Sequence, residues 1–256
     1  MNVLSWDKFR AKTSEKVPSA ITIGVYDGVH IGHKSLIANI LDKNLYSIVF
    51  TFGNSPKSFR KSNKMKSLMS IDDRLLTFAS MGIDEVVLID FSPDFSKLTG
   101  EDFLQEIEKK SDLRQITIGF NFHCGKDRDT NSRDIESRYH NSNTKVDIID
   151  PVFLGSEKVS SSTIRLAIQN GNLQKANDML GRKYYINIFG KAYEQEGVYV
   201  IYKNDIPYQL PKTGVYPITI QGENNTLCST ELEVYEDKIR WVQKDGSNPV
   251  CIVFES

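Results

Sequence analysis

Short apolar runs alternate with amphipathic stretches between residues 20 and about 150 of this 256-residue chain. The runs are rich in β-branched residues and almost wholly apolar, as in strands buried on both faces of a sheet. The expected strands are 20–25, 46–52, 85–89, 115–119 and 145–149. Apolar residues recur at helical spacing in 36–41 and in 103–107, the latter behind the helix start Thr99-Gly100-Glu101. The pattern predicts an α/β domain with a doubly wound parallel sheet.

The pattern changes beyond residue 160. Two short helices joined at Gly171-Asn172 are expected between residues 160 and 180, where they close the first domain. After Gly181 the chain shows only strand-like runs: 184–189, 197–202, 215–220, 230–235, 238–242 and 250–254. We therefore expect a second, small all-β, barrel-like domain, with the domains at 1–182 and 183–256.

Composition and charge exclude several classes of partner. The chain has 32 basic and 33 acidic residues, so it offers no overall attraction to nucleic acid or to an anionic membrane. Its N-terminus lacks the apolar core of a signal peptide, and no apolar run approaches the roughly 20 residues that span a bilayer. Three cysteines without a C-x-x-C pair indicate neither a disulfide framework nor a zinc site. We expect a cytoplasmic monomer that holds no metal through its own side chains.

The candidate chemistry is concentrated where the first strand ends, in GVYDGVHIGHKSL, residues 24–36. Ligands of open α/β sheets bind at this edge. Its glycines let the backbone turn tightly, and the helix that begins near His33 directs N–H groups at the same place, which predicts a phosphate site. His30 and His33 can both face one phosphate there. An isolated H-x-x-H, by contrast, is more often a pair of ordinary loop and capping histidines.

The segment GVYDGVHIGHKSLI resembles the first motif, G-x-F-D-G-V-H-x-G-H, of the prokaryotic FAD synthetases, within the H-x-G-H nucleotidyltransferase superfamily. Tyr26 replaces the usual Phe. The D-G-V-H extension favours this family over the pantetheine-phosphate and nicotinate-nucleotide adenylyltransferases. The resemblance implies that His30 and His33 are catalytic. It also implies a nucleotide-binding loop made of Gly24, Val25, Tyr26, Asp27, Gly28 and Gly32.

A second segment, VSSSTIR at 159–165, resembles the family's I-S-S-T-x-I-R, with Ser162 where Thr is usual. Hydroxyls at a helix start offer caps and N–H groups to an anion, and Arg165 adds a permanent charge one turn later. The resemblance implies that Arg165 is catalytic and that the β- and γ-phosphates of ATP bind at Ser160, Ser161, Ser162 and Thr163. The alternative is a serine-rich cap followed by a surface arginine.

A third segment, GFNFHCG at 119–125, is similar to the family's G-x-D/N-F-x-F-G. The resemblance makes Asn121 a nucleotide or flavin contact, whereas an Asx turn after a strand is the alternative. His123 is expected to be structural.

One segment departs from the family, because Gly53-Asn54-Ser55-Pro56 stands where P-H-P is usual. The basic run that follows is either a solvated loop or a flap over triphosphate: Lys57, Arg60, Lys61, Lys64 and Lys66.

The resemblance implies an FAD synthetase that joins FMN to the AMP half of ATP and yields FAD and pyrophosphate, with Mg²⁺ accompanying ATP and bridging phosphate oxygens. Two alternatives remain. One is an adenylyltransferase with another phosphate acceptor, and the other is a flavin-binding protein that has lost turnover.

The tail resembles the riboflavin kinase module of the bifunctional members of this family. LGRKYY at 180–185 and LPKTGVY at 210–216 match it, but EQEGVYVIYK at 194–203 replaces the G-R-x-x-G-F-P-T-A-N that serves Mg²⁺ and ATP. About 40 residues follow Tyr216, too few for the strands with the catalytic Glu. We expect a reduced module without kinase activity. The bifunctional enzyme is the alternative, with Glu231 or Glu233 as a remnant of the base.

Overall fold

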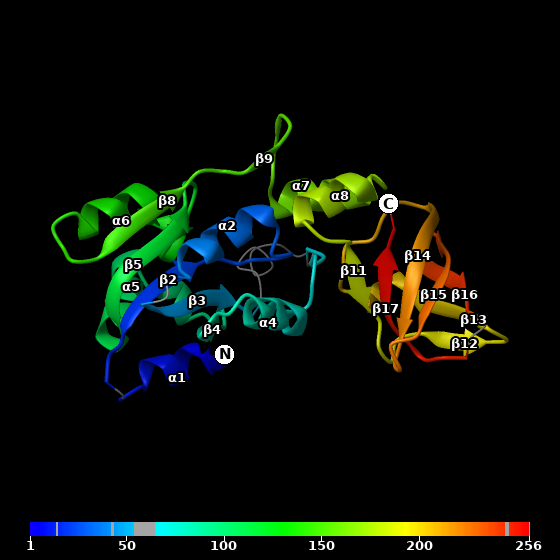
Figure 1. Ribbon diagram of the computed structural model, residues 1–256, viewed down its shortest axis with the longest axis horizontal. Coiled ribbons are helices and arrows are strands. Elements are labelled where there is room, and N and C mark those ends of the chain that lie inside the picture. The colour runs from blue at the N-terminus through cyan, green and yellow to red at the C-terminus, as the bar shows by residue number, and fades with distance from the viewer. Residues whose placement is uncertain (14, 42–43, 54–64, 244–245, 256) are drawn as a thin grey trace. The chain divides into compact units, whose positions relative to one another are not determined.

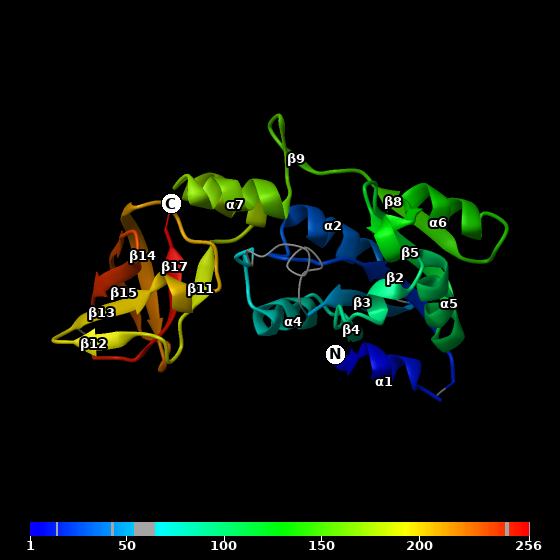
Figure 2. The same cartoon turned by 180° about the vertical axis from the view of Figure 1, so that it is seen from behind.

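The computed structural model describes residues 1–13, 15–41, 44–53, 65–243 and 246–255. The chain forms two compact units, which Figure 1 and Figure 2 show from opposite sides. The first comprises Met1–Met65 and Ile71–Val152, and the second comprises Lys66–Ser70 and Phe153–Ser256. The substituted Asn54-Ser55, with Pro56, lies outside the described residues, and so do four residues of the basic run: Lys57, Arg60, Lys61 and Lys64.

The first unit is built on a six-stranded parallel sheet in the order β1-β4-β3-β2-β5-β8. The strands are β1 (Asn2–Ser5), β2 (Pro18–Ile23), β3 (Tyr46–Phe52), β4 (Glu85–Ile89), β5 (Asp112–Gly119) and β8 (Lys145–Ile149). The five expected strands are confirmed. β1 was not expected, because a four-residue edge strand with three exposed residues carries no apolar run.

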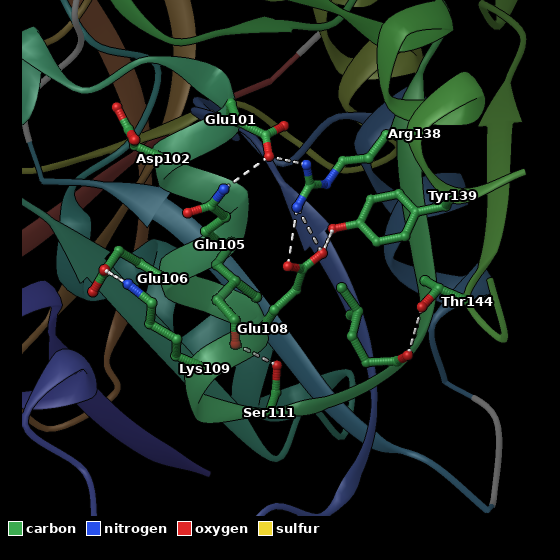
Figure 3. A network of polar contacts seen from close by, with 12 residues as sticks. Glu101, Asp102, Gln105, Glu106, Glu108, Lys109, Ser111, Arg138, Tyr139 and Thr144 are labelled. Carbon is green, nitrogen blue, oxygen red and sulfur yellow. Dashed lines mark hydrogen bonds and ion pairs between the residues drawn. The ribbon is translucent and has the colours of Figure 1, made fainter. Parts of the chain in front are cut away.

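One face of this sheet carries the apolar core. It is covered by α1 (Trp6–Arg10), α5 (Gly100–Lys110) and α6 (Ser132–Tyr139). Phe9 lies with its ring edge-on to Phe50 of β3, with centroids 5.1 Å apart. A polar network joins α5 to α6: Arg138 donates to Glu101 and, at 3.0 Å, to Glu108 (Figure 3). Tyr139 Oη also donates to Glu108, at 2.6 Å, so one cluster of polar side chains joins the two helices.

The opposite face is more polar and is covered by α2 (Ile31–Asn39) and α4 (Ile71–Ser80). Alternation along the strands turns Gln115 and Thr117 away from the apolar core. Gln115 Nε2 donates to Asn39 Oδ1 at 2.8 Å, and Thr117 Oγ1 donates to the same atom at 2.7 Å. Helices therefore lie on both faces, which confirms the doubly wound α/β fold.

Short elements complete the first unit: the paired β6 (His123–Cys124) and β7 (Thr130–Asn131), and the 3₁₀ turns Phe95–Lys97 and Lys126–Arg128. No helix in the described part of the chain is long and apolar enough to span a membrane.

The second unit contains the two expected helices, α7 (Ser161–Gln169) and α8 (Leu173–Leu180), and the short pair β9 (Phe153–Leu154) and β10 (Glu157–Lys158). Its main sheet is antiparallel and seven-stranded, in the order β11-β17-β14-β15-β16-β13-β12. The strands are β11 (Tyr185–Asn187), β12 (Tyr193–Gln195), β13 (Val198–Tyr202), β14 (Gly214–Gly222), β15 (Leu227–Val234), β16 (Lys238–Val242) and β17 (Pro249–Phe254). A second, all-β part is thus confirmed. In its main sheet β12, whose three residues are all exposed, was not expected, and neither was the short pair β9 and β10.

The second compact unit contains α7 and α8 as well as the β strands, and the segment Lys66–Ser70 also belongs to it. Ser67 pairs with Tyr208 through two backbone hydrogen bonds, from Ser67 N to Pro207 O and from Gln209 N to Ser67 O, both 2.9 Å. Arg165 Nε of α7 donates to Lys66 O at 2.8 Å. The functional boundary at residue 182 rests on the family resemblance and stays a prediction.

Candidate active site

The strand order locates the place where a ligand of this fold binds. From β2 the chain passes to β3 on one side, whereas β5 lies on the other side of β2. Ligands of doubly wound sheets bind outside the carboxyl ends of the strands at such a switch point. The segment 24–30 leaves β2 at this point, and Asn121 follows β5 beside it. Two segments that are far apart in the sequence therefore meet at one sheet edge.

The turn after β2 has an unusual backbone. Tyr26 and Val29 have φ values of 53° and 38°, in the left-handed region that a β-branched residue such as Val29 rarely adopts. Gly28, at φ 85°, is suited to this region. Gly24 is required by close approach, since a Cβ there would lie 2.9 Å from the Tyr26 ring. A turn of this kind persists only where surrounding contacts hold it.

Tyr26 is one of those contacts. Its side chain is 1% exposed, and its hydroxyl lies 2.6 Å from Thr22 Oγ1 of β2. Burial raises the pKa of the Tyr26 hydroxyl far above its ordinary value, so the ring is a neutral anchor. The side chain that replaces the family's Phe thus points into the protein, and its hydroxyl has found a partner there.

The two histidines lie on the first turn of α2. His30 is the N-cap, and its Nδ1 accepts a hydrogen bond from His33 N at 3.2 Å. The two imidazole rings are stacked, with centroids 3.5 Å apart and an interplanar angle of 19°. Gly32 permits this arrangement, since a Cβ there would lie 3.3 Å from His30 Nδ1. The capping and the phosphate-site interpretations of H-x-x-H are therefore compatible, because one nitrogen of His30 caps and the other remains for a ligand.

Burial sets the charge of both histidines. It lowers the pKa of His30 to about 4. It lowers the pKa of His33 well below the ordinary value, with further contributions from His30 and from the Arg74 guanidinium. Both imidazoles are thus neutral near pH 7. Since Nδ1 of His30 is an acceptor, its proton is assigned to Nε2, which makes His30 a neutral hydrogen-bond donor.

The second sequence motif forms the start of α7, in the other compact unit. Ser160 is the N-cap: its Oγ accepts from Thr163 N at 3.1 Å and lies 2.8 Å from Thr163 Oγ1. Ser161 and Ser162 occupy the first turn, whose N–H groups have no intrahelical acceptor. Arg165 follows one turn later, with Nε on the Lys66 carbonyl. The structure thus brings these residues together as one cluster and describes it separately from the histidines.

Asn121 is exposed in the turn after β5. The neighbouring ring of His123 has Nδ1 3.0 Å from both Asn121 O and Arg128 Nη2, so it shapes this loop through local contacts.

Arg74 was missed by the sequence reasoning, although it is 5% exposed and contacts the turn itself. Its Nη1 donates to the carbonyl of Val25 at 2.8 Å and to that of Phe52 at 2.9 Å. The sequence does contain a pattern that could have identified Arg74. Ile71, Leu75 and Phe78 mark the apolar face of α4 at i, i+4 and i+7, and Arg74 stands on that face at i+3.

Comparison with known proteins identifies the family. The family model of FAD synthetase matches residues 12–163. The chain belongs to the FAD synthetase family. Members of this family are FMN adenylyltransferases, a class of nucleotidyltransferase.

Two curated relatives and one solved structure are similar to this chain. A bifunctional riboflavin kinase/FMN adenylyltransferase of Listeria monocytogenes is 26% identical over 223 residues, covering 82% of this chain and 70% of the relative. An FAD synthetase of the same species is 28% identical over 234 residues, covering 88% of this chain and 90% of the relative. A crystal structure described as a macrolide-efflux protein from Streptococcus pneumoniae has a TM-score of 0.84 at 21% identity, over 99% of this chain and 90% of that one. It shows the fold alone.

The depressed pKa of His30 predicts how stability depends on pH. As the pH falls from the ordinary value of 6.5 towards about 4, the unfolded chain binds a proton at this position and the folded protein does not. The free energy of unfolding should therefore decrease through this window, by at most about 1.4 kcal/mol per pH unit for each such histidine. Urea unfolding at several pH values between 7 and 4 measures this slope. His30→Asn, which retains an N-cap acceptor, should flatten it; an equal slope in both proteins would contradict the assignment.

Proposed function

We propose that this protein transfers AMP from ATP to FMN and releases FAD and pyrophosphate. The observation that carries the proposal is the pair of neutral, stacked imidazoles on the first turn of α2, at the switch point of a sheet in an FAD synthetase family member.

The proposed reaction is an in-line displacement. A phosphate oxygen of FMN attacks the α-phosphorus of ATP, a new P–O bond forms, and the bond to the β-phosphate breaks so that pyrophosphate leaves. The nucleophile is already an anion, so no protein base is needed. Negative charge grows on the α-phosphate oxygens and on the leaving oxygen. Nε2–H of His30, the ring of His33 and the first N–H groups of α2 are donors suited to that charge, and their positions are fixed before the reaction.

The remaining site residues receive binding roles. Ser160, Ser161, Ser162, Thr163 and Arg165 are proposed to hold the β- and γ-phosphates, because a helix start and a guanidinium both favour anions. The backbone of Gly24 to Gly28 is proposed to lie against the nucleotide, with Asn121 contacting the nucleotide or the flavin. Every group assigned comes from one chain, and we propose that the enzyme acts as a monomer.

Mg²⁺ is proposed to enter with ATP. Among the described residues, no group of three or more His, Cys, Asp or Glu side chains is placed to hold a metal ion. A cation held chiefly by phosphate oxygens and water fits such a site, because Mg²⁺ dehydrates reluctantly and is often bound through substrate phosphates. It would neutralise charge on the triphosphate while the chain's own donors orient the α-phosphate.

We further propose that the β part has no riboflavin kinase activity. The stretch that replaces the family's P-T-A-N forms part of β12, β13 and a 3₁₀ turn, with Tyr199 and Ile201 in the core. Glu233, one candidate remnant of the base, accepts hydrogen bonds from Tyr235 and from Arg240, which lower the pKa of its carboxyl. A carboxylate so stabilised is a weak base. The L. monocytogenes relative of matching length is named FAD synthetase alone, which supports the same conclusion.

Identification of the products tests the principal activity. With ATP and Mg²⁺, the purified protein should convert FMN to FAD and release pyrophosphate, whereas phosphopantetheine and nicotinamide mononucleotide should give no adenylylated product. Chromatography separates the nucleotides. Adenylylation of another acceptor in place of FMN would show a different transferase, and no transfer to any acceptor would leave a binding protein.

Loss of one transition-state contact should lower the rate of FAD formation by roughly tenfold to a thousandfold. This is expected for His30→Asn, His33→Ala and Arg165→Ala. His30→Asn is the sharpest of the three because it keeps the helix cap and removes the Nε2–H donor. The controls His123→Ala and His140→Ala should stay within a few fold of the wild-type rate. If the three site variants retain wild-type turnover and melting curves, these residues are structural.

Riboflavin tests the second activity. Supplied with riboflavin, ATP and Mg²⁺, the protein should form neither FMN nor FAD, while the same preparation forms FAD from FMN. The internal comparison excludes an inactive sample. FMN or FAD appearing from riboflavin at a rate comparable to FAD synthesis from FMN would establish the bifunctional enzyme instead.

A further inference from the structure

A buried arginine, Arg74, contacts the backbone turn that leads to the proposed phosphate site. Arg74 lies on the face of α4 that covers the polar side of the sheet. The protons of its Nη1 are shared by three oxygens: Val25 O at 2.8 Å, Phe52 O at 2.9 Å and Thr51 Oγ1 at 3.2 Å. Its Nε is buried and has no hydrogen-bond partner among the described residues. These hydrogen bonds of the guanidinium thus go to residues at or just beyond the carboxyl ends of β2 and β3, which are adjacent in the sheet.

The Val25 carbonyl is the common point of these contacts. Thr51 Oγ1 also donates to it, at 3.1 Å, so that two side chains from different elements hold one backbone oxygen. Val25 directly precedes the residues with positive φ, Tyr26, Gly28 and Val29. Each non-glycine residue in that region costs of the order of 1 kcal/mol, and hydrogen bonds to a charged donor can offset such a cost. The turn that leads to His30 is therefore tied to the end of β3.

The charge of Arg74 acts on the same site. Burial disfavours the guanidinium and lowers its pKa, while the neighbouring Asp27 carboxylate opposes that effect. Burial is the main cause of the lowered pKa of His33, and the charges of His30 and Arg74 further disfavour its protonated form. The Arg74 charge thus adds to the effect of burial on His33, and the Asp27 carboxylate acts on Arg74 in turn.

We propose that Arg74 is a positioning residue for the phosphate site, which fixes the turn between Val25 and His30 through the Val25 carbonyl and supplies a buried positive charge beneath it. It contacts no reacting atom. The proposal rests on the proposed adenylyl transfer for its kinetic consequence, but the geometry of the turn and the titration of His33 are independent of the acceptor.

Two substitutions separate charge from packing. Arg74→Gln removes the charge, and Arg74→Lys keeps it with fewer hydrogen bonds. In Arg74→Gln we expect kcat for FAD formation to fall roughly ten- to a hundredfold, because a small misplacement of catalytic groups has this effect, while KM for FMN stays within a few fold. Arg74→Lys should recover part of the loss. Arg133→Gln, which removes an exposed arginine paired with Glu136, is the matched control and should behave as wild type.

Titration of the imidazole nitrogens gives a readout that a purely structural role would not move. With four histidines in the chain, the ¹⁵N signals of His33 can be assigned by comparison with His33→Ala. Removal of the neighbouring positive charge should raise the pKa of His33 in Arg74→Gln and leave it near the wild-type value in Arg74→Lys. If wild type makes no FAD, the proposed reaction fails, and this titration still decides the role of Arg74.

Two results would overturn the inference: a folded Arg74→Gln with wild-type kcat, or equal losses in both Arg74 variants with no change in the titration of His33. If neither variant folds, Thr51→Val decides, because it removes the second donor to Val25 and keeps the charge. That variant should lose a few fold in kcat with His33 unchanged, and wild-type turnover in it would contradict the proposal.

Discussion

The candidate site depends on the hydrogen bonds that hold one backbone oxygen, the carbonyl of Val25. The turn that follows it contains two non-glycine residues at positive φ, and the chain does not adopt such a path without external support. Thr51 at the end of β3 and Arg74 on α4 both donate to this oxygen. This turn leads directly to His30, the N-cap of α2, whose ring stacks on that of His33.

One face of the sheet mainly stabilises the fold, and the other face lies on the side of the candidate site. Aromatic and aliphatic side chains fill the face under α1, α5 and α6, where burial of apolar area stabilises the fold. The face under α2 and α4 buries hydroxyl and amide groups instead, among them Thr22, Thr51 and Gln115. Each of these has a partner of defined direction, since a buried polar group without one is costly. Directional contacts fix positions more narrowly than apolar packing, and the candidate site lies on this side.

The unit that contains the β strands also includes a segment from an earlier part of the sequence. It includes the five residues Lys66–Ser70, which stand in sequence just before the helix that carries Arg74. Lys66 Nζ donates to the carbonyls of Lys203 and Ile206, and Ser67 pairs with Tyr208. Arg165, assigned to the triphosphate from its motif, also holds this segment through Lys66 O. These contacts join Lys66–Ser70 to the same compact unit as the β strands.

The sequence by itself determined the longer strands, several helices and the motif that they carry. Periodicity and turn residues suffice for five parallel strands, for α7 and α8 and for most of the tail, because each depends on neighbouring residues. Several short elements were not predicted, among them α1, α6 and the edge strands β1 and β12. β1 pairs with the distant β4, whereas β12 is a three-residue exposed strand that pairs with the adjoining β13. Only the tertiary structure decided that His30 both caps α2 and stays neutral, and that Arg74 supports Val25 from 49 positions away. Burial and hydrogen bonds between residues far apart in the sequence set these properties, and the local pattern of residues predicts neither of them.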